Sequence, residues 1–158
     1  MKNVTEAGRW LRDAEACLRS AQRALEIQDY RVAVQNAQLC VELSAKAVIA
    51  QFAEPLWRHD PSPQLRHLLD DHGEAIVRRG GEEMLASLRQ LAEDAREAAP
   101  WHGWSTYGRE LEDKGWVAAV DLASEAVASD LLQRAQRSLQ TAQSLAVLLF
   151  TSPSAEKE

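Results

Sequence analysis

A stripe of polar side chains runs along an otherwise apolar segment that begins at Asp29 and ends near Phe52. If the segment is a helix, with about 100° between successive residues, the polar members fall within about 80° of one another. They are Arg31, Gln35, Gln38, Glu42 and Lys46. A helix of this kind must be covered elsewhere by partner helices, so we expect it to be central and its polar side chains to face a shared cleft.

The end of the stripe places an acid four residues before a base, and this pair has two interpretations. Glu42 and Lys46 form either an ordinary surface ion pair, worth about 0.3 kcal/mol, or part of a ligand site. In the second interpretation Gln38, Glu42 and Lys46 lie at the edge of a cleft, where Lys46 meets a ligand phosphate as a point charge and Glu42 orients it. The isolation of the stripe among apolar residues is the observation that supports the second interpretation, and both stay open.

Aromatic side chains concentrate between Pro100 and about residue 122, in a segment that several glycines interrupt. They are Trp101, Trp104, Tyr107 and Trp116. Such rings plug the end of a bundle or a dimer seam. Alternatively, Trp101, His102, Trp104, Tyr107 and Arg109 form a lid that stacks on a base, at roughly 1–3 kcal/mol per base. In either case we expect something to cover the rings.

The helices that position these groups are predicted from apolar residues at three- and four-residue steps. They span about 5–27, 29–52, 62–79, 82–99 and 124–151. Asp29 caps the second helix, which pairs with the first in an antiparallel hairpin, and Ser62 caps the third, with Pro63 at its first position. Gly80-Gly81 ends the third helix, and 117–127 fits either a strand or a helix. The sequence predicts an all-α fold, an antiparallel up-and-down four-helix bundle with an additional shorter helix and a Trp-rich loop before the last long helix.

Length and charge indicate one ordinary globular domain over residues 1–152, followed by a disordered tail at 153–158. A chain of 158 residues buries roughly 70% of its unfolded surface, so it needs no metal or disulfide for stability. The sequence has 24 acidic and 18 basic residues, a formal charge of −6, and no tract of Lys or Arg, which argues against duplex DNA as a partner. The chain has neither a secretion signal nor an apolar run long enough to span a bilayer, so we expect a cytoplasmic protein.

The spacing of cysteine and histidine gives no sign of metal or thiol chemistry. Cys17 and Cys40 fall on apolar helix faces, so we interpret them as buried small hydrophobic residues rather than a disulfide or a catalytic thiol. The four histidines lack the spacing of metal ligands. We therefore expect neither a metal nor a cofactor.

Several elements taken together resemble the HEPN (higher eukaryotes and prokaryotes nucleotide-binding) domains over about residues 5–150. They are Leu11, Ala14, Leu18 and Ala21, then Asp29-Tyr30, Ala33, Ala37-Gln38, Glu42 and Lys46-Ala47, and finally Arg66-His67, Leu68-Leu69 and Tyr107-Gly108 ahead of Trp116. The resemblance implies a helical bundle that is frequently a homodimer and is often paired with a minimal nucleotidyltransferase partner. In some branches it implies a metal-independent ribonuclease toxin of a toxin–antitoxin pair.

The resemblance also implies where a nuclease would carry its catalytic pair, an Arg followed four to six residues later by a His near the start of the last long helix. No histidine follows His102, so that helix lacks the pair. Arg66 and His72, and likewise Arg96 and His102, have the spacing at other places. In a nuclease, Arg66 would stabilise the phosphate charge and His72 would act as general acid or base. His72 also shares an apolar stripe, typical of a hydrogen-bonded core residue, and points about 120° away from Arg66.

We therefore expect a nucleotide-binding or partner-binding module that acts with a nucleotidyltransferase-type partner, forms a homodimer and does not catalyse alone. The predicted ligand-binding residues are Gln38, Glu42, Lys46, His67, Tyr107 and Arg109. Thr106-Tyr107 stands here in place of the Arg-Tyr toward which the family tends, which argues against carrying an anion-binding role over to this segment, unless Arg109, two residues after Tyr107, replaces that arginine from the other side. Two alternatives stay open. One is a ribonuclease toxin that uses either Arg66 and His72 or Arg96 and His102, and the other is a structural dimerisation bundle.

Overall fold

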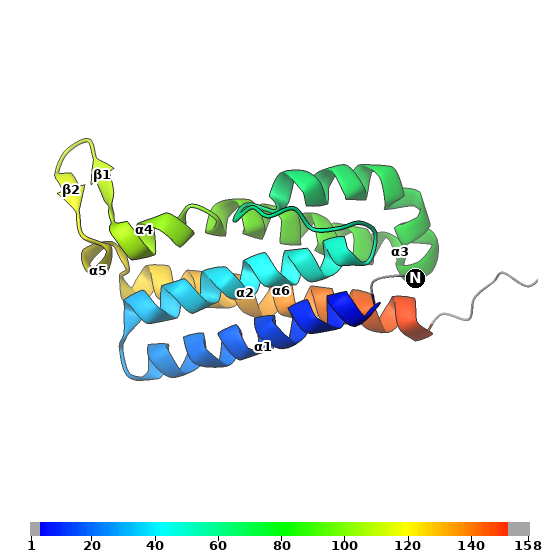
Figure 1. The fold of residues 1–158 in the computed structure, drawn as a ribbon, viewed down its shortest axis with the longest axis horizontal. Helices are drawn as coiled ribbons and strands as arrows, with labels where there is room; N and C mark the ends of the chain where they lie inside the picture. Colours follow the sequence, from blue (N-terminus) through cyan, green and yellow to red (C-terminus); the bar gives the residue numbers. More distant parts are fainter. Residues whose placement is uncertain (1–3, 152–158) are drawn as a thin grey trace, which may run out of the picture.

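The computed structural model describes residues 4–151, which form a helical bundle with a small hairpin at one end (Figure 1). The elements in chain order are α1 (Val4–Glu26), α2 (Tyr30–Ala50), α3 (Ser62–Ala98), α4 (Trp101–Tyr107), β1 (Arg109–Leu111), β2 (Gly115–Val117), α5 (Ala119–Leu122) and α6 (Glu125–Thr151). The predicted all-α fold is confirmed. None of the helices within residues 4–151 has the length and apolar character needed to cross a bilayer. The predicted tail at 153–158 lies outside the described residues.

The helices alternate in direction, and α3 reverses on itself at one glycine. α1 runs toward the end of the molecule that carries the hairpin, α2 returns, the second limb of α3 runs back, and α6 returns again (Figure 1). The reversal in α3 occurs at Gly81, whose backbone has φ 78° and ψ 175°, a conformation that side chains with a Cβ rarely adopt. The predicted break at Gly80-Gly81 is therefore confirmed, and the first limb of α3 is the additional helix.

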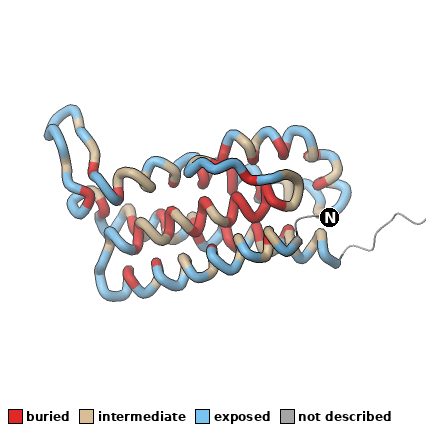
Figure 2. Tube along the Cα trace, viewed as in Figure 1, coloured by how far each residue is buried: buried red, intermediate tan, exposed pale blue. Residues whose placement is uncertain are grey.

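The bundle is centred on α2, which packs against α1, α3, α4 and α6. Nearly every residue of α2 after its first turns is buried, and the buried segments concentrate along it in Figure 2. Val34, Val41 and Ile49 are inaccessible to solvent. Cys40 is buried as predicted, whereas Cys17 is only half-buried.

Each predicted helix start lies within one residue of the start that the structure shows. Asp29 is the N-cap of α2, and its Oδ1 accepts the Val32 N–H at 3.3 Å, which satisfies one of the unpaired donors of a first turn. Ser62 was expected to cap the next helix but is instead its first residue. Its N–H donates to Asp60 Oδ1 at 3.0 Å, so the carboxylate of Asp60 takes the part predicted for the serine.

The Trp-rich segment was predicted to be a loop, and this prediction is wrong. It consists of α4, an antiparallel hairpin in which Arg109 pairs with Val117 and Leu111 with Gly115, and the short α5. Gly108 joins α4 to β1 at φ 77°, and a Cβ there would collide with the Val117 carbonyl oxygen. The ambiguous residues 117–127 contain the end of β2, α5 and the first turn of α6.

The rings of this segment are not all covered. Trp101 and Trp104 are half-buried and meet edge to face, with centroids 5.3 Å apart. Tyr107 and Trp116 are 76% and 67% exposed. The expectation that something covers the rings therefore fails for these two within the described chain.

Candidate functional site

The first half of the polar stripe on α2 fixes α4 in place. Arg31 Nε and Gln35 Nε2 both donate to the Ser105 carbonyl oxygen, at 2.8 and 3.1 Å. The guanidinium of Arg31 also reaches the Thr106 carbonyl oxygen at 3.2 Å. The last carbonyls of a helix have no partner within the helix, and cations are favourable there. Arg31 and Gln35 therefore act as a C-terminal cap supplied by another helix.

The second half of the stripe forms a buried hydrogen-bonded network. Gln38 Nε2 donates to Glu42 Oε2 at 2.9 Å, and Lys46 Nζ donates to Glu42 Oε1 at 3.0 Å. The side chains of Glu42 and Lys46 are only 5% and 9% exposed, so the surface-pair interpretation is wrong. Trp10 of α1 adds a covering ring whose centroid lies 5.6 Å from Lys46 Nζ.

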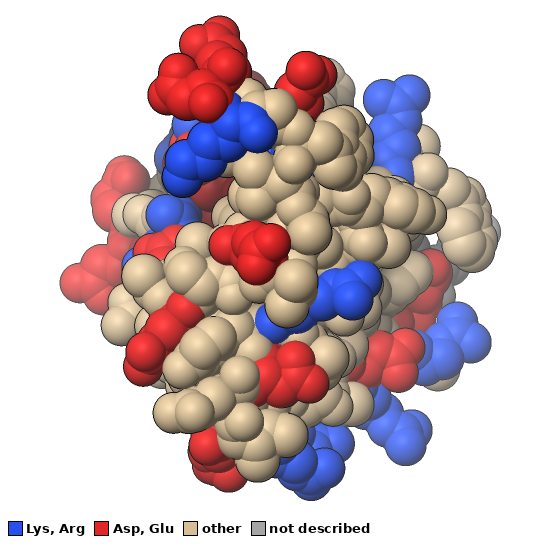
Figure 3. Space-filling view, turned by 90° about the vertical axis from the view of Figure 1, so that its left-hand side faces the viewer, with Lys and Arg blue, Asp and Glu red and all other residues tan. Residues whose placement is uncertain are grey.

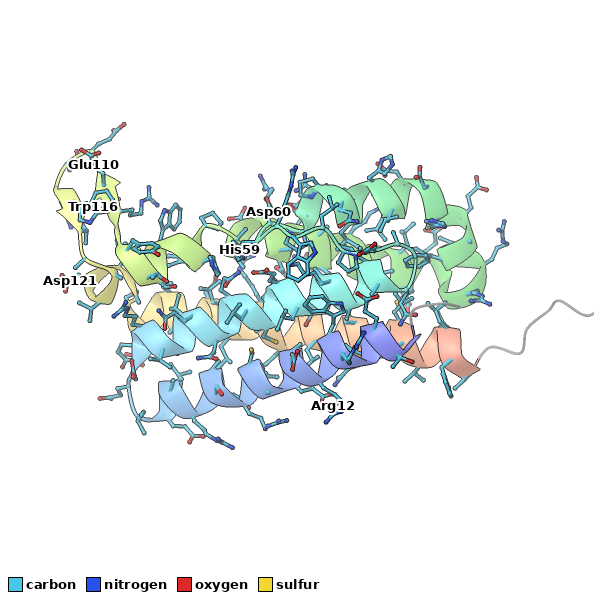
Figure 4. All side chains as sticks on the ribbon, viewed as in Figure 1. Arg12, His59, Asp60, Glu110, Trp116 and Asp121 are labelled. Atoms are coloured by element: carbon cyan, nitrogen blue, oxygen red, sulfur yellow. The ribbon has the colours of Figure 1, made fainter. Side chains whose placement is uncertain are left out.

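Two histidines cover the network from other segments. His59 belongs to the connecting segment 51–61 and His102 to the first turn of α4; their rings stack with centroids 3.6 Å apart and 16° between the planes. His59 Nδ1 lies 3.4 Å from Glu42 Oε1, and His102 Nδ1 lies 3.4 Å from Gln38 Oε1. Figure 4 shows His59 on the connecting segment, which passes across α2, whereas Arg12 points away from the other edge of the bundle.

The network combines groups that bind anions, transfer protons or ligate cations. A buried ion pair is a poor device for stability, because the desolvation of both charges offsets their attraction. The carboxylate and amide oxygens only accept hydrogen bonds, so each of these contacts needs a hydrogen on Nδ1 of the ring as the donor. An ammonium, a carboxylate and two imidazoles within contact distance form a site with chemical capability, and we take this network as the candidate functional site.

The other residues predicted to bind ligand lie elsewhere. His67 is exposed and pairs with Asp71, with His67 Nε2 3.3 Å from Asp71 Oδ2. The guanidinium of Arg109 lies over the Trp104 ring, 4.0 Å from its centroid. Tyr107 faces solvent at the hairpin end. Of the predicted set, the structure thus brings Gln38, Glu42 and Lys46 together. It places His67, Tyr107 and Arg109 outside the network.

The predicted nuclease residues Arg66 and His72 have different neighbours. A guanidinium nitrogen of Arg66 lies 3.6 Å from a carboxylate oxygen of Glu93, on the second limb of α3. His72 is half-buried and stacks on Phe52 with ring centroids 4.8 Å apart. The geometry of an ideal helix already separates the two side chains, and the fold gives each a separate partner.

Sequence reasoning missed His59 and assigned His102 to other roles. His102 was considered as part of an aromatic lid and as the partner of Arg96, but Arg96 pairs with carboxylates of its own helix. No local signal identifies His59, because its neighbours Glu42 and His102 come from two other segments. The histidines lack the spacing of metal ligands along the chain, but the fold brings potential ligand atoms of Glu42, His59 and His102 to within 4.8 Å of one another.

A second buried charge, also unanticipated, connects α3 to α6. Asp94 is fully buried and accepts two hydrogen bonds of 2.6 Å from Arg137 and one of 3.0 Å from Arg134. The hydrogen bond to Asp94 raises the pKa of Arg137. A cavity of 460 Å³ between α3 and α6 adjoins it. Because the three charged groups satisfy one another, we interpret this cluster as structural.

The site described above lies in an all-α bundle whose central helix carries polar residues on one narrow stripe. The sequence model of the HEPN domain matches residues 7–125, which is most of the chain. The protein belongs to the HEPN domain family, whose members are nucleotide-binding and ribonuclease-type modules. No curated protein and no solved structure matches the chain.

Proposed function

We propose that this protein is a nucleotide-binding HEPN module whose ligand site is the network of Gln38, Glu42 and Lys46 under His59 and His102. The observation that carries the proposal is the buried ammonium of Lys46, held 3.0 Å from Glu42. An ammonium has three donors, and the bond to Glu42 uses one. The other two are available to a phosphate oxygen, and the low-dielectric surroundings strengthen the attraction between the ammonium and the phosphate.

Access to Lys46 depends on the connecting segment 51–61. The side chain of His59 is 63% exposed, so this ring can move aside more readily than the half-buried His102. One face of the His59 ring covers His102. We propose that a base stacks on the other face of this exposed ring, an interaction worth roughly 1–3 kcal/mol. A nucleotide would then place its phosphate on Lys46 and its base against His59.

The proposed role also needs a protein partner. This partner is either a second copy of the chain or a nucleotidyltransferase-type protein. The hairpin end carries exposed apolar side chains, among them Tyr107, Trp116 and Val120. Figure 3 looks at this end and shows uncharged surface interrupted by scattered acidic and basic side chains. Aromatic residues are enriched at protein interfaces and dominate their energetics. The module is proposed to supply binding while the partner supplies catalysis.

The ligand half is tested by melting curves and calorimetry with each common ribonucleotide, in the presence of a chelator. Wild-type protein is expected to melt at a higher temperature with at least one nucleotide, and Lys46→Ala is expected to abolish the shift. Lys114→Ala, which changes an exposed lysine in the hairpin turn, is the matched control and should keep it. No shift with any nucleotide, or an equal loss in both variants, would contradict the proposal.

A second candidate function is metal-independent ribonuclease activity, which the stacked pair of His59 and His102 beside Lys46 favours. Cleavage of a phosphodiester needs a general acid, a general base and a cation near the phosphate. This candidate predicts RNA cleavage in the presence of a chelator that is lost in His102→Ala and retained in His72→Ala. Intact RNA after incubation with the wild-type protein would exclude it.

A further inference from the structure

Three potential ligands for a single cation meet at the candidate site. They are Glu42 of α2, His59 of the connecting segment 51–61 and His102 of α4, and their ligating atoms all lie within 4.8 Å of one another. The geometry points to a divalent transition-metal site of the Zn²⁺ type formed by these three side chains. The inference goes beyond the proposed function, because an ion can occupy this site whether or not a nucleotide binds.

The residue types fit such an ion. Two imidazoles and one carboxylate are a ligand set of zinc sites that keep a fourth position open for water or substrate. Imidazole nitrogen favours Zn²⁺ and its neighbours in the first transition row over Mg²⁺ or Ca²⁺. The carboxylate is already held by Gln38, which donates to Glu42 Oε2, so an outer-shell partner orients the ligand as in established metal sites.

The distances between the potential ligand atoms can be compared with those of a tetrahedral site. Donors bonded to Zn²⁺ at about 2.0–2.1 Å are separated by about 3.3 Å at the corners of a tetrahedron. His59 Nδ1 and Glu42 Oε1 are 3.4 Å apart, which is close to one such edge. To bind the ion through Nδ1, the His59 ring must carry its hydrogen on Nε2 instead, so the ion replaces the Nδ1–H···Oε1 hydrogen bond. The rings now stack almost in parallel, so they must fan apart for both to direct a lone pair at one ion. His59 is the ring able to do so, because it is exposed and lies on the connecting segment.

The charge of Lys46 should weaken metal binding, and this effect provides a test of the site. Its ammonium lies 3.0 Å from the same Glu42 oxygen, so it competes with a cation for that carboxylate. Removing this charge should therefore strengthen metal binding, whereas removing a ligand should weaken it. A purely structural role of the histidine stack predicts neither effect.

The test is titration of the chelator-treated full chain with Zn²⁺ by calorimetry, and with Co²⁺ by visible absorption. One ion per chain is expected, with the absorption bands of four-coordinate Co²⁺. His59→Ala and His102→Ala should each weaken binding by more than about 100-fold, beyond the 10–100-fold cost of losing an outer-shell partner. His67→Ala, which removes an exposed histidine paired with Asp71, is the matched control and should leave it unchanged.

Lys46→Met provides the second readout, since it should bind Zn²⁺ more tightly than the wild type. Absence of Zn²⁺ binding, or binding that is equal in wild type, His59→Ala and His102→Ala, would overturn the inference. The nucleotide experiment is carried out with chelator present, so its failure and the failure of the metal site are separate results. A nucleotide shift without Zn²⁺ binding removes only the metal site, and Zn²⁺ binding without a nucleotide shift leaves only the metal site standing.

Discussion

His59 and His102 stack ring on ring, with 3.6 Å between their centroids, although the whole of α3 separates them along the chain. The stack joins the connecting segment 51–61 to the start of α4 directly above the buried carboxylate of Glu42. Two segments that follow different helices are thereby held over the same stretch of α2. The contact thus closes the candidate site, and its loss should loosen that closure while leaving the bundle intact.

His59→Ala should lower the free energy of unfolding by only about 0.5–1.5 kcal/mol, the range for a ring-stacking contact. The larger effect should be local. Amide hydrogen exchange is expected to accelerate within 54–61 and at the start of α4, while exchange in the core of α2 stays slow. Equal acceleration throughout α2 would show that the stack supports the whole fold, contrary to this view.

The Glu42 and Lys46 pair should show strong energetic coupling. Glu42→Leu leaves the Lys46 ammonium buried without its carboxylate. Lys46→Met leaves the Glu42 carboxylate buried without its cation, although Gln38 still donates to it. Each change is therefore expected to cost about 3–5 kcal/mol. The double variant should recover most of this loss, because it buries no uncompensated charge. Urea denaturation of all four proteins measures the coupling. Additive costs would indicate that the two charges do not depend on each other.

The sequence predicted the parts of the site that lie on one helix. The period of α2 identified Gln38, Glu42 and Lys46 correctly as one row, because a helix fixes the directions of its own side chains. The burial of that row was harder to predict, because the connecting segment and α4 cover it. The positions of these two segments do not follow from the period of α2. His59 was missed for the same reason.

Local signals also decided where the fold prediction succeeded and where it failed. The break at Gly81 was visible because a glycine pair interrupts a regular apolar stripe. The hairpin at 109–117 was missed, because three-residue strands are too short to show alternation. α4 was missed because Gly103 and the preceding Pro100 suggest a loop, while its stability comes from Arg31 and Gln35 on another helix.

Asp94→Asn should destabilise the protein by about 3 kcal/mol, because it leaves Arg134 and Arg137 facing a neutral group at a fully buried position. The matched control is Asp70→Asn, since Asp70 and Arg89 form a pair 3.6 Å apart whose side chains are more than half exposed. That change should fall within about 0.5 kcal/mol of wild type. Thermal and urea unfolding measure both, and similar values would refute the structural role given to Asp94.

Cys40 should make stability depend on pH in the alkaline range. Burial raises the pKa of its thiol from 9.0 to about 12, so the folded protein holds this proton more tightly than the unfolded chain. The resulting stabilisation is present below pH 9 and is lost as the pH rises toward 12. Cys40→Ala should therefore show a flatter decline of unfolding free energy over this interval. In wild type, alkylation of Cys40 should require unfolding; ready labelling of the folded protein would contradict the burial argument.

The joint between α4 and β1 should tolerate only glycine at position 108. Gly108→Ala places a Cβ against the Val117 carbonyl oxygen and forces alanine to φ 77°, at a cost of about 2 kcal/mol or more. Gly103→Ala is the matched control, because a Cβ there meets nothing within 4 Å and alanine favours the helix by up to about 1 kcal/mol. The first variant should lose the hairpin amide protection seen by hydrogen exchange and the second should keep it. Retained protection in Gly108→Ala would mean that the hairpin does not need this joint.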